Sequence, residues 1–452
     1  MSDAVHHDLS GDRITISGDA ARLAWNATLE ALMAHAAATP EHLARTLGAD
    51  PDFALAHAAK GLMLLTLARA ELVAPARDCL GKARAAAVRR PVTLDDAARR
   101  AAERLEAILL AHPFDVLALK LSHGLRFMLG DQAQMLATLN RYAPGFGETH
   151  PLAGFVHGCH AFALEERGFY AQAERTGRRA VALSPRDAWG RHAVAHVLEM
   201  TGRVDEGIAW LGDGRPVAHA NNLRFHIVWH LALFRLERGE TPEVLRLYDE
   251  EIRAEPTDDY RDIANGASLL ARLDYAGVDV GDRWEELAAK AEGRIHDGRL
   301  VFADLHYALS LLGAGHADGA EAIARSLIED AEAHPSGERR AAARNGAFAA
   351  FGLIAFHEGD YDEAARLLGS ARDGLLAIGG SHAQRDLFEQ AHAESLIRAG
   401  QHDRAAQLLG ERLTRRGGNN LFAARRLAQL RSHGAGRLAA LAVASTPLAI
   451  AH

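Results

Sequence analysis

One arrangement of apolar and polar residues recurs along most of the chain. An apolar segment of helical length ends at a glycine, a short polar stretch follows, and a second helical segment rich in Ala and Leu comes next. Such a pattern predicts pairs of amphipathic helices. The glycine favours a helix stop, because the left-handed conformation at a helix C-terminus costs glycine nothing. The glycines in question are Gly130, Gly168, Gly202, Gly239, Gly277, Gly315, Gly359 and Gly400.

The spacing of these glycines is close to that of a known helical repeat. Successive glycines are separated by 38, 34, 37, 38, 38, 44 and 41 residues. A period near 34 is typical of tetratricopeptide helix–turn–helix units, and short insertions lengthen it. The segment 154–187 fits the repeat best, because Ala161, Ala173 and Ala180 fall at its small-residue positions and Pro185 falls at its proline position. We therefore expect repeats that bury their apolar faces against one another.

These observations predict an all-α fold of tetratricopeptide-like helix–turn–helix repeats in a right-handed superhelix, an α-solenoid. We expect an N-terminal cap segment at residues 1–48, the repeats at residues 49–412 and C-terminal capping helices at residues 413–452. The alternating stretch Arg13–Ser17 is too short to anchor a sheet. The apolar stretch Leu438–Ile450 is too short to span a bilayer.

Composition and charge fit such a helical protein. The 452 residues are 48% hydrophobic but only 6% aromatic, and Ala and Leu dominate, which favours closely packed helices. The net charge is −8 with mixed signs, so nothing favours a nucleic acid or a membrane surface as partner. Two cysteines, Cys79 and Cys159, give no disulfide framework, and the polar N-terminus lacks a signal-peptide core. We expect a cytoplasmic protein, and the sequence is compatible with a homo-oligomer.

Two pairs of histidines fall on the helix face that lines the groove of such a superhelix. His192 and His196 take positions 5 and 9 of one repeat, and His226 and His230 take positions 2 and 6 of the next. Positions separated by three, four or seven residues share one helix face. We therefore expect the four imidazoles of two adjacent helices to converge.

Each pair has the form H-x-x-x-H, which allows two histidines to ligate one metal ion. Glu199 lies on the same face as His196 and is a candidate third ligand or base. A zinc-protease helix needs Glu directly after the first His, where this chain has Ala193. Three interpretations remain open: a divalent metal site, a polar pocket for an organic ligand, and histidines that merely pack in a narrow interior.

Other polar residues lie on or near the expected inward helices. A lone Lys or Arg at such a place is more often a solvated residue or the partner of a nearby carboxylate. As ligand-binding candidates we select His57, Lys120, His123, Asp304, His306, Arg385 and Asp386.

The chain also resembles the tetratricopeptide repeat protein 38 family, which occurs in animals and bacteria. The resemblance extends from about Asp50 to Arg412, but residues 310–345 and the tail beyond 412 match poorly. It implies an α-helical repeat fold and supports the selected histidines and charged residues as shared motif positions, but it supplies no reaction. The strings that carry it are DPDFALAHA (50–58), DVLALKLSH (115–123), ERGFYAQAE (166–174), DAWGRHAVAHVLEM (187–200), HIVWHLAL (226–233), GVDVGDRW (277–284), FADLH (302–306) and GGSHAQRD (379–386).

The leading hypothesis is a central pocket that binds a small polar or anionic ligand, with the four histidines as its floor. Lys120 and Arg385 would bind a carboxylate or phosphate, and Glu199, Asp304 or Asp386 would orient an imidazole. Such a pocket could serve a hydrolase or lyase that uses histidine acid–base chemistry or a divalent metal ion. The alternative is a tetratricopeptide interaction scaffold that holds a peptide or a partner in an open groove. A purely structural scaffold with a packed interior is the third possibility.

Overall fold

The computed structural model describes residues 6–11, 13–14, 16–86, 97–212, 217–334 and 338–432. These residues form helices and one two-stranded ribbon, in which His6–His7 (β1) pairs antiparallel with Arg13–Ile14 (β2). The all-α prediction is confirmed. None of the helices in the described part of the chain is long and apolar enough to cross a membrane. The expected apolar stretch Leu438–Ile450 lies outside the described residues.

The helix–glycine–helix pattern is also confirmed. All eight glycines have positive φ angles, between 66° and 83°. The backbone N–H of the residue after each glycine donates a hydrogen bond to the carbonyl five residues earlier, as the N–H of Phe169 does to Leu164 at 2.9 Å. This bond satisfies a carbonyl that the helix end would otherwise leave without a partner. The helix pairs that flank the glycines are α6–α7, α8–α9, α10–α11, α12–α13, α14–α15, α16–α17, α18–α19 and α20–α21.

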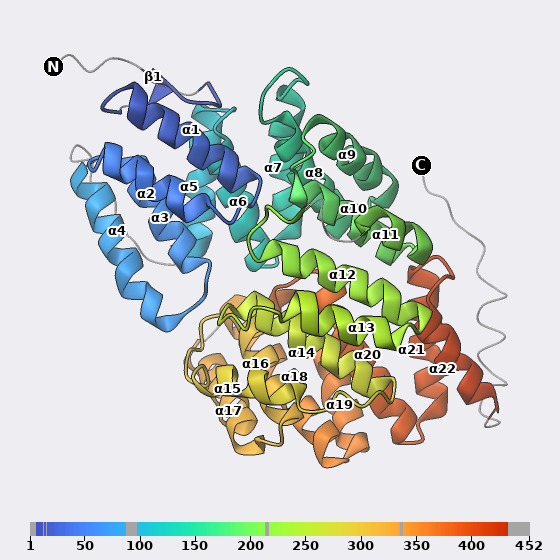
Figure 1. Cartoon of the computed structure of the whole chain (residues 1–452). Helices are drawn as coiled ribbons and strands as arrows, with labels where there is room; N and C mark the ends of the chain where they lie inside the picture. Colours follow the sequence, from blue (N-terminus) through green and yellow to red (C-terminus); the bar gives the residue numbers. More distant parts are fainter. Residues whose placement is uncertain are drawn as a thin grey trace. The chain divides into compact units, whose positions relative to one another are not determined.

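The chain forms two compact units, which are described separately. The first unit comprises Met1–Val197, Leu211–Val228 and Thr257–Asp262. Within it, α1 packs on α2, α3 on α4, α5 on α6 and α8 on α9. Its helices (Figure 1) are α1 (Asp19–Met33), α2 (Thr39–Ala49), α3 (Ala54–Leu65), α4 (Val73–Ala86), α5 (Ala97–Ala111), α6 (Val116–Met128), α7 (Gln132–Tyr142), α8 (Ala153–Glu166), α9 (Tyr170–Leu183), most of α10 (Ala188–Met200), the start of α12 (Leu223–Arg238), and the short 3₁₀ turns Ala70–Leu72 and Ala143–Gly145.

The second unit comprises Leu198–Trp210, Trp229–Pro256 and Ile263–His452. In this unit, α17 packs on α18, α18 on α19, α19 on α20 and α21 on α22. Besides the ends of α10 and α12, its helices are α11 (Val204–Leu211), α13 (Thr241–Leu247), the π-turn Tyr248–Ile252, α14 (Tyr260–Tyr275), α15 (Arg283–Glu292), α16 (Val301–Gly313), α17 (Ala317–Ala333), α18 (Glu338–Glu358), α19 (Tyr361–Arg372), the 3₁₀ turn Leu375–Ile378, α20 (His382–Arg398), α21 (His402–Arg415) and α22 (Leu421–Ser432).

Small residues bring α8 and α9 close together. The predicted small positions Ala161, Ala173 and Ala180 are all fully buried. Gly154 on α8 leaves no room for a Cβ atom, because Ser184 and the carbonyl of Ala180 already occupy that space. A larger side chain at these positions would overpack the contact, which typically costs about 1–3 kcal/mol. This close packing fixes the position of α8, whose C-terminal turn carries the acidic part of the site described next.

Candidate functional site

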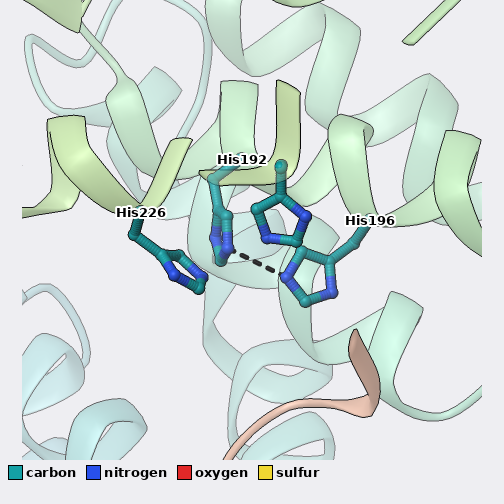
Figure 2. A group of neighbouring side chains, drawn as sticks. His192, His196 and His226 are labelled. Atoms are coloured by element: carbon teal, nitrogen blue, oxygen red, sulfur yellow. Dashed lines mark hydrogen bonds between the residues drawn. The ribbon is translucent and has the colours of Figure 1, made fainter. Parts of the chain in front are cut away.

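The histidines at the centre of the sequence prediction lie on α10 and α12. His192 and His196 are one turn apart on α10, and the Nε2 atoms of their rings are 2.9 Å apart. His226, near the start of α12, places its ring centre 4.9 Å from that of His192. One ring nitrogen from each of these three residues lies within 4.8 Å of the other two. Figure 2 shows the three rings facing one another. The structure thus brings His192, His196 and His226 together within the first unit.

Glu165, in the last turn of α8, lies against His196. Its Oε2 atom lies 3.3 Å from Nδ1 of His196, and both side chains are fully buried. When Nδ1–H donates to this carboxylate, the lone pair of His196 resides on Nε2, the atom that faces His192. A carboxylate behind the imidazole is the arrangement that fixes the tautomer of metal-binding histidines.

A second carboxylate adds negative charge beside the first. Glu166 is also buried, and its Oε2 atom accepts a hydrogen bond from the Nε2 amide of Gln132 on α7. Oxygen atoms of Glu165 and Glu166 and a nitrogen of His196 lie within 4.8 Å of one another. Buried negative charge is costly unless a positive charge accompanies it. These carboxylates therefore favour a cation at the imidazoles, either a proton or a metal ion.

Aromatic rings surround the histidines. Phe162 on α8 stacks on His192, with ring centres 5.5 Å apart and planes 21° apart, and meets His196 edge-on at 5.4 Å. Trp189 lies 5.0 Å from His192 on the preceding turn of α10. These rings displace water from the imidazoles, and a lower local dielectric strengthens every electrostatic interaction among the polar groups.

Lys120 and His123 on α6 reach the same aromatic rings. The Lys120 ammonium lies 4.8 Å from the ring centre of Trp189 and 3.4 Å from the sulfur of Cys159. Burial raises the pKa of the Cys159 thiol, which disfavours the nucleophilic thiolate. His123 packs edge-on against Trp189 and Phe162, and burial, with help from the Lys120 charge, holds its pKa well below the usual value. His123 is therefore a neutral imidazole near neutral pH.

His35 is a further member that the sequence argument did not select. It follows α1 and stacks on Trp189 with ring centres 5.1 Å apart and planes 13° apart. Its φ angle is 52°, a left-handed conformation that is unusual for a residue with a side chain. Its carbonyl accepts a hydrogen bond from the amide of Asn221, which ties the end of α1 to the segment before α12. Strain of this kind costs about 1–3 kcal/mol and persists only where the surroundings enforce it.

His230 belongs to the second unit, where Glu199 orients it. The Oε2 atom of Glu199 lies 3.0 Å from Nδ1 of His230, as the sequence argument expected of a carboxylate that fixes an imidazole. This pair repeats the pair Glu165–His196 with an offset of 34 residues in both members (199 − 165 and 230 − 196). The same Glu–His pairing thus occurs twice, 34 residues apart.

Two other selected residues, Asp304 and His306, lie in the second unit on α16. Burial raises the pKa of Asp304 to about 7, and its Oδ2 atom has no hydrogen-bond partner among the described residues. Burial lowers the pKa of His306 to about 4, and its Nδ1–H donates to the carbonyl of Phe302 at 2.7 Å. That bond lies within one turn of the same helix, so His306 is held by its own helix.

Arg385 and Asp386, at the start of α20, have structural partners within the second unit. Arg385 donates to the carbonyl of Gly380 just before the helix. Asp386 binds Arg412 through both carboxylate oxygens and Arg416 at 3.0 Å. Neither arginine was selected from the sequence: Arg412 is the last residue of the predicted repeats, and Arg416 lies in the predicted capping segment.

The hydrogen bond of the His57 ring is local and does not involve the groups described above. Its ring bonds the carbonyl of Pro51, at 2.7 Å, at the turn before α3. This bond connects the helix to its own N-terminal turn, and it gives His57 a local structural role within the first unit.

The residues that sequence reasoning missed in the first unit are Glu165, Glu166, Phe162, Trp189 and His35. One signal was present for Glu165, since it occupies the same repeat position as Glu199, which had been selected. For the aromatic residues the signal was absent, because apolar positions of helical spacing look alike whether they face a site or a core.

The chain matches no known protein-family model. The function of the site is therefore inferred from its own residues.

Proposed function

We propose that this chain is a tetratricopeptide-like helical-repeat protein of the tetratricopeptide repeat protein 38 family that binds a divalent transition-metal ion through His192, His196 and His226. The observation that carries the proposal is the geometry at His196: a buried carboxylate at Nδ1 and a second imidazole nitrogen 2.9 Å from Nε2. A metal ion bound by several imidazoles needs neutral rings with their lone pairs facing one another, and Glu165 selects the required tautomer.

The donor set indicates which metals fit. Three imidazole nitrogens are typical ligands of Zn²⁺, Cu²⁺, Ni²⁺ and Fe²⁺, whereas Mg²⁺ and Ca²⁺ prefer oxygen ligands. Catalytic zinc sites use three protein ligands and keep a fourth position for water or substrate. A metal ion of this kind lowers the pKa of a bound water and so supplies a nucleophile at neutral pH.

The reaction class that these residues support is hydrolysis or elimination on a small polar substrate. His226 is only half-buried, so the group is accessible on the side of α12. Lys120 offers an ammonium group beside Trp189 that can bind a carboxylate or phosphate of a substrate. His123 is a neutral imidazole at the same ring and can donate or accept a hydrogen bond there.

The decisive experiment is metal analysis of protein purified without a histidine tag and then reconstituted. We expect about one equivalent of a first-row transition metal per chain, since a site of several imidazoles binds such ions tightly. His196→Ala should abolish the tight site. Glu165→Gln should weaken metal affinity about 10- to 100-fold, as loss of an orienting carboxylate does elsewhere.

His160→Gln is the matched control, because His160 also lies in the first unit but bonds Asn140 at 2.8 Å. It should keep the metal content of the wild type. Less than about a tenth of an equivalent in the wild type after exposure to Zn, Mn, Fe, Ni and Cu would defeat the proposal. A folded protein without metal that instead binds peptides in a His226-dependent way would favour the interaction scaffold.

A further inference from the structure

The second unit contains a cleft that is lined by Glu199 and by several arginines. Its volume is about 100 Å³, enough for a group the size of roughly three water molecules. The wall is built from α12, α14, α20, α21 and α22, together with the end of α10 and the start of α11. The charged residues of the wall are Glu199, Glu237, Arg272, Asp386, Arg412, Arg416, Arg425 and Arg426, five positive and three negative, so the wall carries a net charge of +2.

At the centre of the wall, three guanidinium groups surround a single carboxylate. Asp386 binds Arg412 with both oxygens, accepts a hydrogen bond from Arg416 at 3.0 Å and lies 3.9 Å from Arg272. All four side chains are nearly inaccessible to solvent. Buried charges are stable only when opposite charges accompany them, and one carboxylate cannot balance three arginines.

The remaining carboxylates at this point are already shared. The Oε1 atom of Glu199 lies 3.7 Å from Arg416, while its other oxygen holds His230. Glu389 lies 3.3 Å from Arg412 but also binds the exposed Arg415. Glu237 also acts on the charge of Arg412. In the wall, Glu199, Glu237 and Asp386 therefore match Arg272, Arg412 and Arg416 in number, and the net charge of +2 comes from Arg425 and Arg426.

Arg272 is the guanidinium of the cluster whose charged form burial disfavours. Burial lowers its pKa, in spite of the opposing effects of Asp386 and Glu199, and the charge of Arg412 lowers it further. A guanidinium held in this way is stabilised by any additional anion that reaches it. Its side chain lies in the wall of the cleft, over the ring of Trp229.

The rim of the cleft adds a guanidinium that is available to a ligand. Arg425 on α22 is exposed, and no ion pair is found for it among the residues that the structure describes. The amide side chains of Gln390, Asn419 and Asn420 also line the cleft and offer neutral hydrogen-bond donors.

We infer that this cleft is a binding site for a small anion that carries a carboxylate or phosphate group. Guanidinium groups recognise both through paired N–H donors, and their planar shape suits two oxygens at once. The anion answers the net positive charge of the wall, with the exposed Arg425 at the rim and Arg416 and Arg272 inside the cleft as its principal contacts. This site lies wholly in the second unit and does not depend on the metal proposed for the first.

The experiment is calorimetric titration and thermal unfolding with inorganic phosphate and with succinate, each against sodium chloride of equal ionic strength. Phosphate and succinate separate the two ligand classes. We expect saturable binding of at least one of them and a matching rise in melting temperature. Arg425→Gln should weaken the binding about tenfold or more, since a lost hydrogen bond to a charged group typically has this effect.

Arg366→Gln serves as the matched control, because Arg366 is an exposed arginine of the same unit that pairs only with its helix neighbour Glu363. It should leave the affinity unchanged. Arg416→Gln tests the buried part of the site, and its folding is checked by circular dichroism beforehand. Arg425→Gln keeps the test decisive even if Arg416→Gln does not fold. The inference is overturned if neither anion binds beyond the chloride control, or if Arg425→Gln binds as well as the wild type.

Discussion

At the scale of single residues, buried carboxylates of the second unit show opposite electrostatic surroundings. Asp386 is enclosed by arginines, which hold its pKa below the usual range against the effect of burial. Asp304 is also deeply buried, and burial raises its pKa to about 7; Asp297 and Asp330 add to this rise, and the charge of Arg339 opposes it. The negative charge of Asp386 stabilises the folded chain, whereas that of Asp304 destabilises it. Of these two residues, a neutral replacement should therefore stabilise the protein only at Asp304.

Asp304→Asn should stabilise the protein at pH 8 by about 1–2 kcal/mol. The ordinary pKa of 3.8 applies to the unfolded chain, so between pH 4 and pH 7 the unfolded state loses this proton first, and stability falls as the pH rises. Asn carries no charge, so its advantage should shrink as the pH falls toward 5. Urea unfolding at pH 8 and pH 5 measures this difference. Asp318→Asn, an exposed change on the neighbouring α17, should shift stability by no more than a few tenths of a kcal/mol.

At the scale of elements, the helix pairs were predictable because their signal is local. A glycine with positive φ and the bond behind it involve only six consecutive residues, as in Leu164–Phe169. The side chains that meet across helices were only partly predictable. The 34-residue period indicated that His192 and His226 share a face, but the position of Glu165 opposite His196 depends on how α8 packs. The sequence indicates the Glu165–His196 pair only through the repeat, because both residues lie 34 positions before the pair Glu199–His230.

The α20–α21 pair offers a direct test of the role of its glycine. Gly400 has a φ angle of 70° and open space around the position of a Cβ, so Gly400→Ala meets no clash but must adopt a left-handed conformation. We expect a loss of about 1–2 kcal/mol. Gly410→Ala is the matched control in the interior of α21, again with open space, and should gain about 0.5–1 kcal/mol. Equilibrium unfolding of both variants decides the matter, and equal effects would contradict a special conformation at Gly400.

At the scale of the whole molecule, the parts that sequence reasoning could not foresee are contacts between distant segments. His35 and Trp189 are 154 positions apart (189 − 35) and still stack. Asp386 on α20 meets Arg412 and Arg416 at the end of α21. Periodicity shows which face of a helix is apolar, but not which distant side chain will cover it. The helix pairs could therefore be predicted from the glycine spacing, and of the site in the first unit only the helix-borne histidines could be predicted with them.

Buried neutral histidines should govern part of the response of the whole chain to acid. His306 and His392 have pKa values lowered to about 4 by burial, and nearby arginines add to the effect: Arg272 for His306, and Arg372 and Arg404 for His392. Histidines of the unfolded chain take up protons near pH 6.5. Between pH 7 and pH 4 the unfolded state therefore binds more protons than the folded state, and the stability of the folded chain falls as the pH falls. Each residue should contribute a loss of about 1–2 kcal/mol at pH 5.

His392→Gln isolates one of these contributions, because glutamine keeps a polar side chain of similar length but cannot take up the proton. The wild type and the variant are compared by urea unfolding at pH 7.5 and pH 5. From pH 7.5 to pH 5 the wild type should lose about 1–2 kcal/mol more than the variant does. The comparison at pH 7.5, where the imidazole is neutral, reports any packing effect of the substitution beside Gly369 and is subtracted. Parallel pH profiles would show that His392 is protonated in the folded chain as easily as in the unfolded one, contrary to its burial between α19 and α21.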